Sequence, residues 1–230
     1  MTTIEVPPHT IVVYADLACP WAHLAVHRLH ETRARLGLEG AVTLDVHAFA
    51  LELIDDKPAP KLVLDAEIPV VGALAPDAGW QVWQAPAHEW PVSVLLALEA
   101  VEAAKRQGPA ASENLDRALR RALFAESRTI SMRHVILDVA RNCDGVDAEA
   151  LDAALLTGAA RAAIQRDLVN SRGDAVQGSP HLFLPDGTDV HNPGIRLRWE
   201  GKPGAGFPVI ERDDPAIYDD LLTRAAAPPS

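Results

Sequence analysis

The sequence contains little cysteine and few aromatic residues, and it has no long apolar segment. Only two of its 230 residues are cysteine, and 5% are aromatic. Two cysteines are too few for a disulfide scaffold or a tetrahedral zinc site. No stretch approaches the roughly 18 apolar residues of a membrane helix, and the N-terminus lacks the basic start and apolar core of a signal peptide. We therefore expect a cytoplasmic protein whose cysteine chemistry uses one or two thiols.

Basic residues are also scarce relative to acidic ones. The chain has 21 lysine and arginine residues against 32 aspartate and glutamate residues, which gives a formal charge of −11. Such a charge repels polyphosphates and anionic lipids, so neither nucleic acid nor a membrane surface is an expected partner. The glycine-rich nucleotide loops, the Gly-x-Ser-x-Gly elbow and the HExxH motif are missing as well. The remaining composition, 48% hydrophobic and 23% charged, is that of a globular protein with a sizeable core.

The first half of the chain predicts an α/β unit followed by an irregular connection. Residues 11–17 and 41–51 have the pattern of strands, and between them an amphipathic helix follows Pro20 and stops at Gly37. Two strands joined by a helix favour a parallel pair with a right-handed crossover. Six prolines between residues 57 and 91 then predict a long irregular connection.

The second half of the chain predicts helices, then a hairpin and a last helix. The predicted helices of the middle region span residues 92–106, 113–125, 132–142, 148–156 and 159–171. Strand-like runs at 181–184 and 188–191 flank a Pro-Asp-Gly sequence that is typical of a turn. Beyond them, a glycine-rich, locally basic loop could hold a carboxylate through Arg196 or Arg198, although a solvated hairpin tip explains the same residues. The last helix is predicted over about 215–225.

Cys19 is the main candidate for chemistry. It lies where a strand gives way to a helix, a position at which unpaired backbone N–H groups and the helix dipole favour a thiolate. We therefore expect a lowered thiol pKa and partial exposure. The alternative is a buried, inert cysteine that caps the helix.

Two segments carry a resemblance to a known family. YADLACPWAHLAVHRL, residues 14–29, resembles the active-site segment of the DsbA-like branch of the thioredoxin superfamily, and FrnE-type oxidoreductases in particular. VQGSPHLFL, residues 176–184, is similar to the cis-proline loop of that family and the strand after it. The resemblance implies an α/β thioredoxin-like fold with a helical insertion. In that organisation residues 1–56 and 158–230 form the thioredoxin-like domain, and residues 57–157 form the irregular connection and the helical insertion.

One residue departs from the family pattern. Ala22 occupies the position of the second, resolving cysteine, so Cys19 cannot form a disulfide with position 22. The resemblance then implies a thiol-disulfide oxidoreductase that works through a single thiol on small thiols or mixed disulfides. Glutathione or mycothiol is the expected cosubstrate, and no tightly bound cofactor is expected.

Two other functions remain open. The first is an enzyme similar to kappa-class glutathione transferases or 2-hydroxychromene-2-carboxylate isomerases, in which Cys19 would replace a serine that steadies a glutathione thiolate. The second is a redox-inactive protein that uses the inherited crevice to bind a peptide or small ligand. An oligomer is also possible, since amphipathic helices offer a dimer surface.

The resemblance extends to the neighbours of Cys19. Its motif partners are Pro20, Trp21 and Ala22, and Trp21 should border the site. A cis bond at Ser179-Pro180 would free the Ser179 backbone to pair with a substrate peptide or a cysteinyl thiol.

Other neighbours of Cys19 leave alternative roles open. Asp16 either shuttles a proton or, as we favour, caps the turn. His23 could lower the thiol pKa as a cation, and His181 could face the sulfur.

Some remaining residues favour structural roles. His23, His27 and His30 share a helical face, but no further ligand completes a metal site, so we expect none. Cys143 could resolve a mixed disulfide only if the insertion folds over the active site, and packing at a helix end is the preferred role. Trp80 and Trp83 could line an acceptor pocket, but we expect them to anchor the proline-rich connection to the core.

Overall fold

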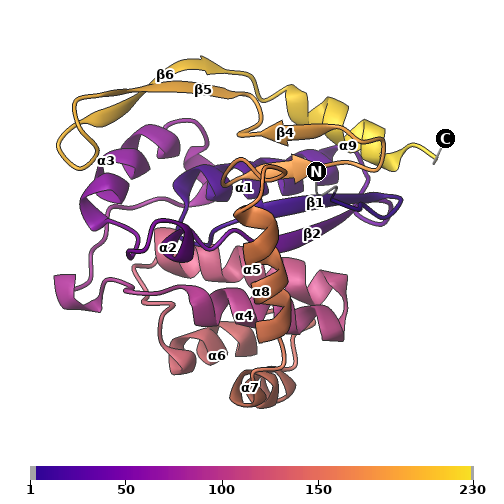
Figure 1. Cartoon of the computed structure of the whole chain (residues 1–230), viewed down its shortest axis with the longest axis horizontal. Helices are drawn as coiled ribbons and strands as arrows, with labels where there is room; N and C mark the ends of the chain where they lie inside the picture. The colour runs from indigo at the N-terminus through magenta and orange to yellow at the C-terminus, as the bar shows by residue number, and fades with distance from the viewer. Residues whose placement is uncertain (1–3, 229–230) are drawn as a thin grey trace.

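The computed structural model describes residues 4–228 and contains a mixed sheet of four strands in the order β2-β1-β3-β4 (Figure 1). The strands are β1 (Thr10–Ala15), β2 (Thr43–Ala48), β3 (His181–Phe183) and β4 (Asp189–His191). β1 is parallel to β2, whereas β3 is antiparallel to both β1 and β4. The predicted parallel pair and the predicted hairpin are therefore confirmed.

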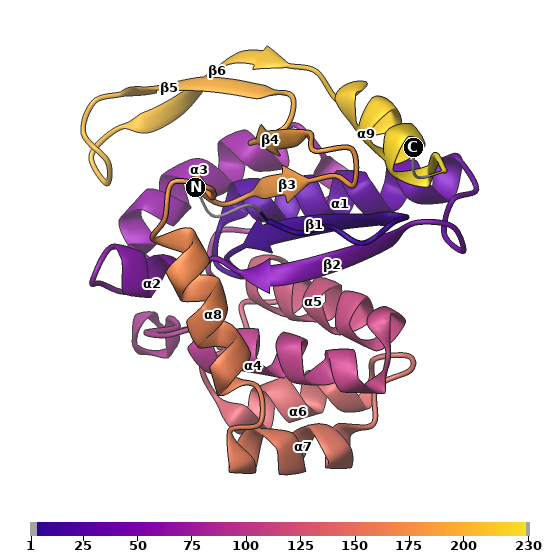
Figure 2. The same cartoon turned by 45° about the vertical axis from the view of Figure 1, so that its right-hand side comes forward.

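Helices pack on the sheet and extend beyond its β2 edge. Near the sheet, α1 (Pro20–Arg35) contacts α9 (Ile217–Ala226), α3 (Lys61–Gly72) and α5. The helices between residues 95 and 171, here called the helical block, lie on the β2 side (Figure 2). They are α4 (Leu95–Ala104), α5 (Pro109–Phe124), α6 (Arg133–Arg141), α7 (Ala148–Thr157) and α8 (Arg161–Ser171). α5 and α8 contact β2, while α6 and α7 lie farther from the sheet.

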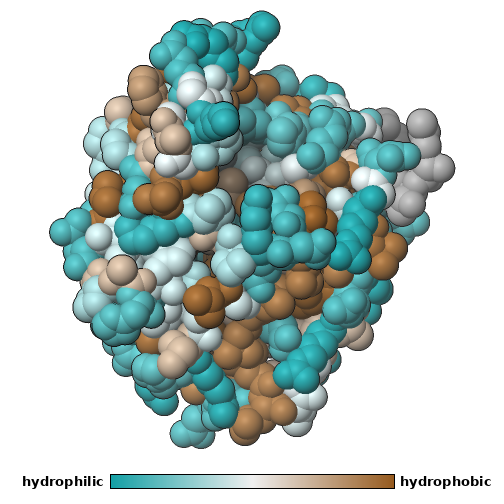
Figure 3. All heavy atoms as spheres, turned by 60° about the vertical axis from the view of Figure 1, so that its left-hand side comes forward, coloured by the Kyte–Doolittle hydropathy of each residue, from teal (hydrophilic) through white to brown (hydrophobic). Residues whose placement is uncertain are grey.

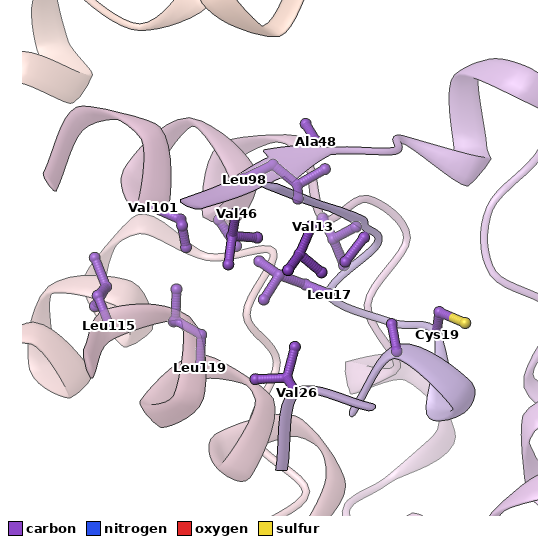
Figure 4. Packing of buried hydrophobic residues seen from close by; sticks show 14 of the residues in the cluster. Val13, Leu17, Cys19, Val26, Val46, Ala48, Leu98, Val101, Leu115 and Leu119 are labelled. Carbon is purple, nitrogen blue, oxygen red and sulfur yellow. The ribbon is translucent and has the colours of Figure 1, made fainter. Parts of the chain in front are cut away.

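The main core joins the sheet to the helical block. Apolar side chains from β1, β2, α1, α4 and α5 meet in one cluster, in which Val13, Val46, Leu98 and Leu119 pack together (Figure 4). Because Leu119 is fully buried in α5, the helical block shares this core with the sheet. The start of α1 therefore packs against this shared core.

The prediction of an irregular connection between residues 57 and 91 is wrong in one respect, because this segment contains helices. α2 (Leu51–Ile54) precedes it, α3 lies within it, and the 3-10 turns η1 (Pro76–Ala78) and η2 (Ala87–Glu89) follow. α3 forms in spite of Pro69, which lies in its last turn and removes one backbone N–H donor. Leu64, Ile68 and Val71 stabilise it by burial in the core.

The predicted glycine-rich loop is a two-stranded antiparallel sheet, formed by β5 (Ile195–Glu200) and β6 (Phe207–Asp213). Exposed and half-buried residues alternate along β5, because Ile195, Leu197 and Trp199 face inward while the charged residues between them face solvent. The sequence analysis missed the alternation of apolar and charged residues in β5 because glycines flank this strand. The β5–β6 hairpin arches over α3 and protrudes at the top of the molecule (Figure 1).

The boundaries of the predicted helices shift by a few residues. α5 begins at Pro109 rather than near residue 113, since proline is well suited to the first helical position. The predicted helix over 92–106 divides into α4 and the 3-10 turn η3 (Lys105–Gln107).

Within residues 4–228, no helix has the length and apolar character needed to cross a membrane. The face in Figure 3 is mostly hydrophilic at its top, where the β5–β6 hairpin protrudes, and apolar residues gather in its lower half, at the height of the helical block.

Candidate active site

Cys19 caps the N-terminus of α1 directly after the turn that follows β1. Its backbone is extended, with φ −84° and ψ 116°, and Pro20 begins the helix. The residue is 6% exposed, and its sulfur points away from the neighbouring core side chains (Figure 4). The predicted position at a strand-to-helix turn is therefore correct, but the predicted exposure is not.

The loop before β3 meets this turn, although it lies 160 residues further along the chain. The peptide bond between Ser179 and Pro180 is cis. The Cys19 Sγ–H donates to the Ser179 carbonyl oxygen at 3.2 Å, and the Asp16 N–H donates to Ser179 Oγ at 2.9 Å. The structure thus brings together the two segments on which the resemblance rests.

The protonation of Cys19 differs from the prediction. Burial, with a smaller contribution from the negative charges of Glu67 and Asp16, raises the pKa of the Cys19 thiol to about 12. The neighbouring Ser179 and the backbone N–H of Ala22 oppose this rise only in part. The expectation of a lowered pKa is wrong for this structure, because desolvation of the sulfur outweighs the effect of the helix N-terminus.

Asp16 caps the turn between β1 and α1. Its Oδ1 accepts from the Ala18 N–H at 2.6 Å, and its Oδ2 accepts from the Leu51 N–H at 2.9 Å. Burial raises the pKa of Asp16 to about 6, although these hydrogen bonds oppose the rise. The carboxylate therefore fixes the backbone that leads to Cys19.

Arg120 also holds this turn, and the sequence analysis missed it. The side chain is fully buried, pairs with Asp116 at 2.8 Å and donates through Nη1 to the Asp16 carbonyl oxygen at 2.8 Å. The only sequence signal was an aspartate four residues before an arginine on one helix, which is common on solvated surfaces.

Glu67 of α3 is a second residue that the sequence analysis missed. Its Oε1 accepts from Trp21 Nε1 at 2.9 Å, and burial raises the pKa of the carboxyl. Trp21 is itself buried beside the helix start. The proline-rich composition around Glu67 gave no indication that a helix would bring it to the site.

His23 does not act as a cation beside the thiol. Its ring stacks on Phe124 with centroids 4.9 Å apart and meets the edge of Trp80 at 4.5 Å. Burial, together with the charges of Arg120 and His27, lowers the pKa of His23 to about 3. The ring is neutral, so the predicted electrostatic role is wrong.

His181 does not present a ring nitrogen to the sulfur either. Its Nδ1 accepts from the Gln177 N–H at 3.1 Å, and its Nε2 lies 2.9 Å from Asp189 Oδ1. Both ring nitrogens therefore form hydrogen bonds that hold the segment before the cis bond. Nε2 is the donor to Asp189. Burial lowers the pKa of His181.

The other candidate residues lie outside the site. His30 bonds to Arg33, and within the described part of the chain no group of histidine, cysteine and acidic residues is arranged to hold a metal. Cys143 is a free thiol in the α6–α7 connection, which lies beyond α4 and α5 as seen from the sheet. Arg196 and Arg198 extend from β5 and pair with carboxylates of the hairpin.

The tryptophans of the proline-rich connection anchor it to its surroundings. Trp80 packs against His23 of α1 and Phe124 of α5, with ring centroids 4.5 and 5.5 Å apart, and Trp83 is buried in the main core cluster. The anchoring role that we expected is confirmed for Trp80 and Trp83.

A cysteine at the start of the first helix, in contact with a cis-proline loop at one end of a mixed sheet, defines the thioredoxin-like class of α/β proteins. The family comparison agrees, because the model of the DSBA-like thioredoxin domain matches residues 10–198. The chain belongs to this family. The predicted fold, thioredoxin-like with a helical insertion, is therefore confirmed.

Solved structures of related fold include disulfide oxidoreductases. A probable DsbA oxidoreductase from Streptomyces coelicolor is 20% identical with a TM-score of 0.67, over 94% of this chain and 89% of that one. Cytosolic disulfide reductase DsbM from Pseudomonas aeruginosa, solved with GSH, is 17% identical with a TM-score of 0.59, over 94% and 95%. A 2-hydroxychromene-2-carboxylate isomerase is 16% identical with a TM-score of 0.55, over 79% and 87%. These identities establish a shared fold. No curated protein is significantly similar in sequence.

Proposed function

We propose that the protein is a thiol-disulfide oxidoreductase that works through the single thiol of Cys19 on small thiols or mixed disulfides. The observation that carries this proposal is the contact between the Cys19 sulfur and the backbone of Ser179 at the cis bond. With alanine at position 22, an incoming sulfur meets one thiol at the helix start. The Cys-Pro-Trp sequence supports placing the chain with the FrnE-type members of the family.

The proposed reaction exchanges one disulfide for another. Cys19-SH attacks a mixed disulfide R-S-SG, where GS is the glutathionyl group. A bond forms between the Cys19 sulfur and the glutathionyl sulfur, the S–S bond of R-S-SG breaks, and the leaving thiolate RS⁻ takes the proton from Cys19 to become RSH. A second molecule, GSH, then attacks Cys19-S-SG, which releases GSSG and restores Cys19-SH. Together the two steps convert R-S-SG and GSH into RSH and GSSG, so glutathione is the reductant.

The substrate would lie along the loop before β3. The Ser179 carbonyl oxygen accepts only a weak hydrogen bond from the thiol, so a backbone-like ligand N–H can replace that donor. Glutathione and mycothiol both contain amide groups and a cysteinyl sulfur, which suit such an extended edge. The neighbour DsbM, a cytosolic disulfide reductase solved with GSH, supports a small thiol and a cytoplasmic setting for this chain.

A second candidate function is favoured by the raised pKa of Cys19. A thiol that stays protonated at neutral pH can donate a hydrogen bond to a glutathione thiolate, as a serine hydroxyl would. The reaction would then be a transferase or isomerase step on bound glutathione, and the likeness in fold to the isomerase supports it.

The substitution of Cys19 separates the two candidates. We would assay removal of glutathione from a glutathionylated peptide, with GSH as reductant, in Cys19→Ser, Cys19→Ala and Cys143→Ser variants. For the oxidoreductase, both Cys19 variants lose activity, while Cys143→Ser retains it because Cys143 lies in the connection between α6 and α7 and not at the start of α1.

The pattern expected for the second candidate is different. Conjugation or isomerisation activity would survive in Cys19→Ser and be lost in Cys19→Ala, since only the hydroxyl can donate to the bound thiolate. Unchanged deglutathionylation in both Cys19 variants would overturn the proposed oxidoreductase.

A further inference from the structure

A cavity of about 310 Å³ lies between α1, α5 and η1, and Cys19 is not among its lining residues. Its volume is at the lower end of the range for small-molecule sites, about 300 to 1,000 Å³. Apart from Val26 and Ala78, its walls are charged or imidazole side chains. They are His23, His27 and Glu31 from α1, Asp77 from η1, and Arg117, Arg120 and Arg121 from α5.

Three guanidinium groups converge on this cavity, and their existing partners differ. Arg120 is paired with Asp116 at the back of the cavity, and Arg121 is paired with Glu126 at 3.2 Å. Within the described residues, Arg117 has neither an ion pair nor a hydrogen bond from its side chain. Arg117 is exposed at the cavity mouth, so a ligand can reach it without breaking a protein contact.

The shape of the wall depends on a glycine. Gly79 has φ +78°, and a Cβ at this position would lie 3.3 Å from Arg121 Nη1 and 3.1 Å from the Ala125 side chain. The absence of a side chain lets the Arg121 guanidinium lie close to the backbone beside η1. The guanidinium is thereby held at the cavity.

His23 adds an unsatisfied polar atom to the same wall. Its Nε2 is buried and forms no hydrogen bond of good geometry within residues 4–228, although the Ala78 and Gly79 backbone lies near the imidazole, and the ring is fixed between Phe124 and Trp80. A buried polar atom without a partner destabilises the folded state. A ligand oxygen that reaches this nitrogen would remove that destabilisation.

We propose that this cavity is a second binding site, which takes a small anion carrying a carboxylate or phosphate group. Arg117 and Arg121 would bind its oxygens, since guanidinium groups match carboxylate and phosphate geometry with paired hydrogen bonds. Glu31 and Asp77 at the rim limit the negative charge that the cavity tolerates, so a small anion fits better than a polyphosphate. This inference does not depend on the proposed thiol chemistry.

The site has a direct connection to the active-site turn. Arg120 contributes to the cavity and also donates to the Asp16 carbonyl oxygen, which precedes Cys19 by three residues. An anion beside Arg120 would weaken the positive field of this guanidinium at the Asp16 carboxyl, whose pKa Arg120 helps to lower.

The test is calorimetric titration of the full chain with sodium phosphate and, separately, with sodium succinate, at constant ionic strength. We expect saturable binding of at least one anion, weakened about tenfold or more in Arg117→Ala through loss of a charge-assisted hydrogen bond. The matched control is Arg141→Ala, which removes an exposed arginine at the end of α6, outside the cavity.

Nuclear magnetic resonance then locates the anion. The His23 imidazole signals, assigned by their loss in His23→Gln, should shift with the same saturation curve as the heat, and the tighter anion identifies the preferred group. Absence of saturable binding for both anions would overturn the proposal. Equal weakening in Arg117→Ala and Arg141→Ala would do so as well, because it would indicate general charge screening.

Discussion

Burial and nearby carboxylates act on the Cys19 sulfur in the same direction. The sulfur is desolvated, and the negative charges of Glu67 and Asp16 further disfavour a thiolate. The N-terminus of α1 suggested an activated cysteine, but it lowers the pKa of the thiol too little to offset burial. A substrate that covers the sulfur must therefore supply hydrogen bonds to the thiolate that the protein alone does not provide.

The alkylation rate of Cys19 should rise only at alkaline pH. Because burial raises its pKa, the apparent value should lie well above the ordinary value of about 8.5. Iodoacetamide kinetics from pH 6 to 11, read by peptide mass spectrometry so that Cys143 is scored separately, would measure it. An apparent pKa below the ordinary value would contradict this account of the site.

Neutralising Glu67 should increase the reactivity of Cys19. A Glu67→Gln side chain can still accept from Trp21 Nε1, but it removes a negative charge that disfavours the thiolate. We expect a lower apparent pKa for Cys19 and faster alkylation at pH 8. Glu149→Gln, at an exposed position in α7, is the matched control and should change neither quantity.

Among the elements, α5 links the helical block to the active-site turn. Arg120 is the physical connection, since it is paired with Asp116 on its own helix and bonds to the Asp16 carbonyl oxygen. A fully buried ion pair is sensitive to the loss of one partner, because the other charge remains buried without compensation. α5 thus contributes to the geometry of a site to which it supplies no reacting atom.

Replacing Arg120 should destabilise the protein and loosen the turn. We expect Arg120→Met to lower the free energy of unfolding by about 3 to 5 kcal/mol, measured by urea denaturation. Cys19 alkylation should accelerate in the folded variant. Arg121→Met, at the adjacent exposed position, should cost less than about 1 kcal/mol, and equal losses in the two variants would contradict the role of the buried pair.

The sequence predicted the elements whose local signals agree with their tertiary setting. The β1–α1–β2 unit and the hairpin after Pro180 have clear periodicity and turn residues, so they were found. α3 was missed because Pro69 and neighbouring prolines suggested disruption, whereas burial of Ile68 and Val71 stabilises the helix. Glu67 and Arg120 were missed for a related reason, since only long-range packing brings them to Cys19.

At the scale of the whole molecule, a charged cluster joins the sheet to α8 and to η3 at the end of α4. His47 on β2 lies 2.8 Å from Asp167 of α8 and 3.1 Å from Asp45, which also pairs with Lys105 at 2.7 Å. Tyr14 stacks on the His47 ring. Burial alone would lower the pKa of His47, but its hydrogen bonds to Asp167 and Asp45 raise it to about 9.

Stability should therefore depend on pH through His47. The folded pKa exceeds the unfolded value of about 6.5, so the stabilisation is fully present below pH 6.5 and is lost as pH rises through about 9. Urea denaturation between pH 6 and 10 would measure the loss. Since Lys105 and Tyr14 also titrate at high pH, the difference between the wild type and His47→Gln isolates the histidine, and exposed His88→Gln should leave the profile unchanged.

The two outer strands of the main sheet are protected from aggregation in different ways. β2 is covered by α5 and α8, which leaves little of its edge for another chain to pair with. β4 is only three residues long and exposes Asp189 and His191. Short edge strands with charged side chains are poor templates for strand addition between molecules. The same architecture that supports the thiol therefore also favours a chain that remains dispersed at high concentration.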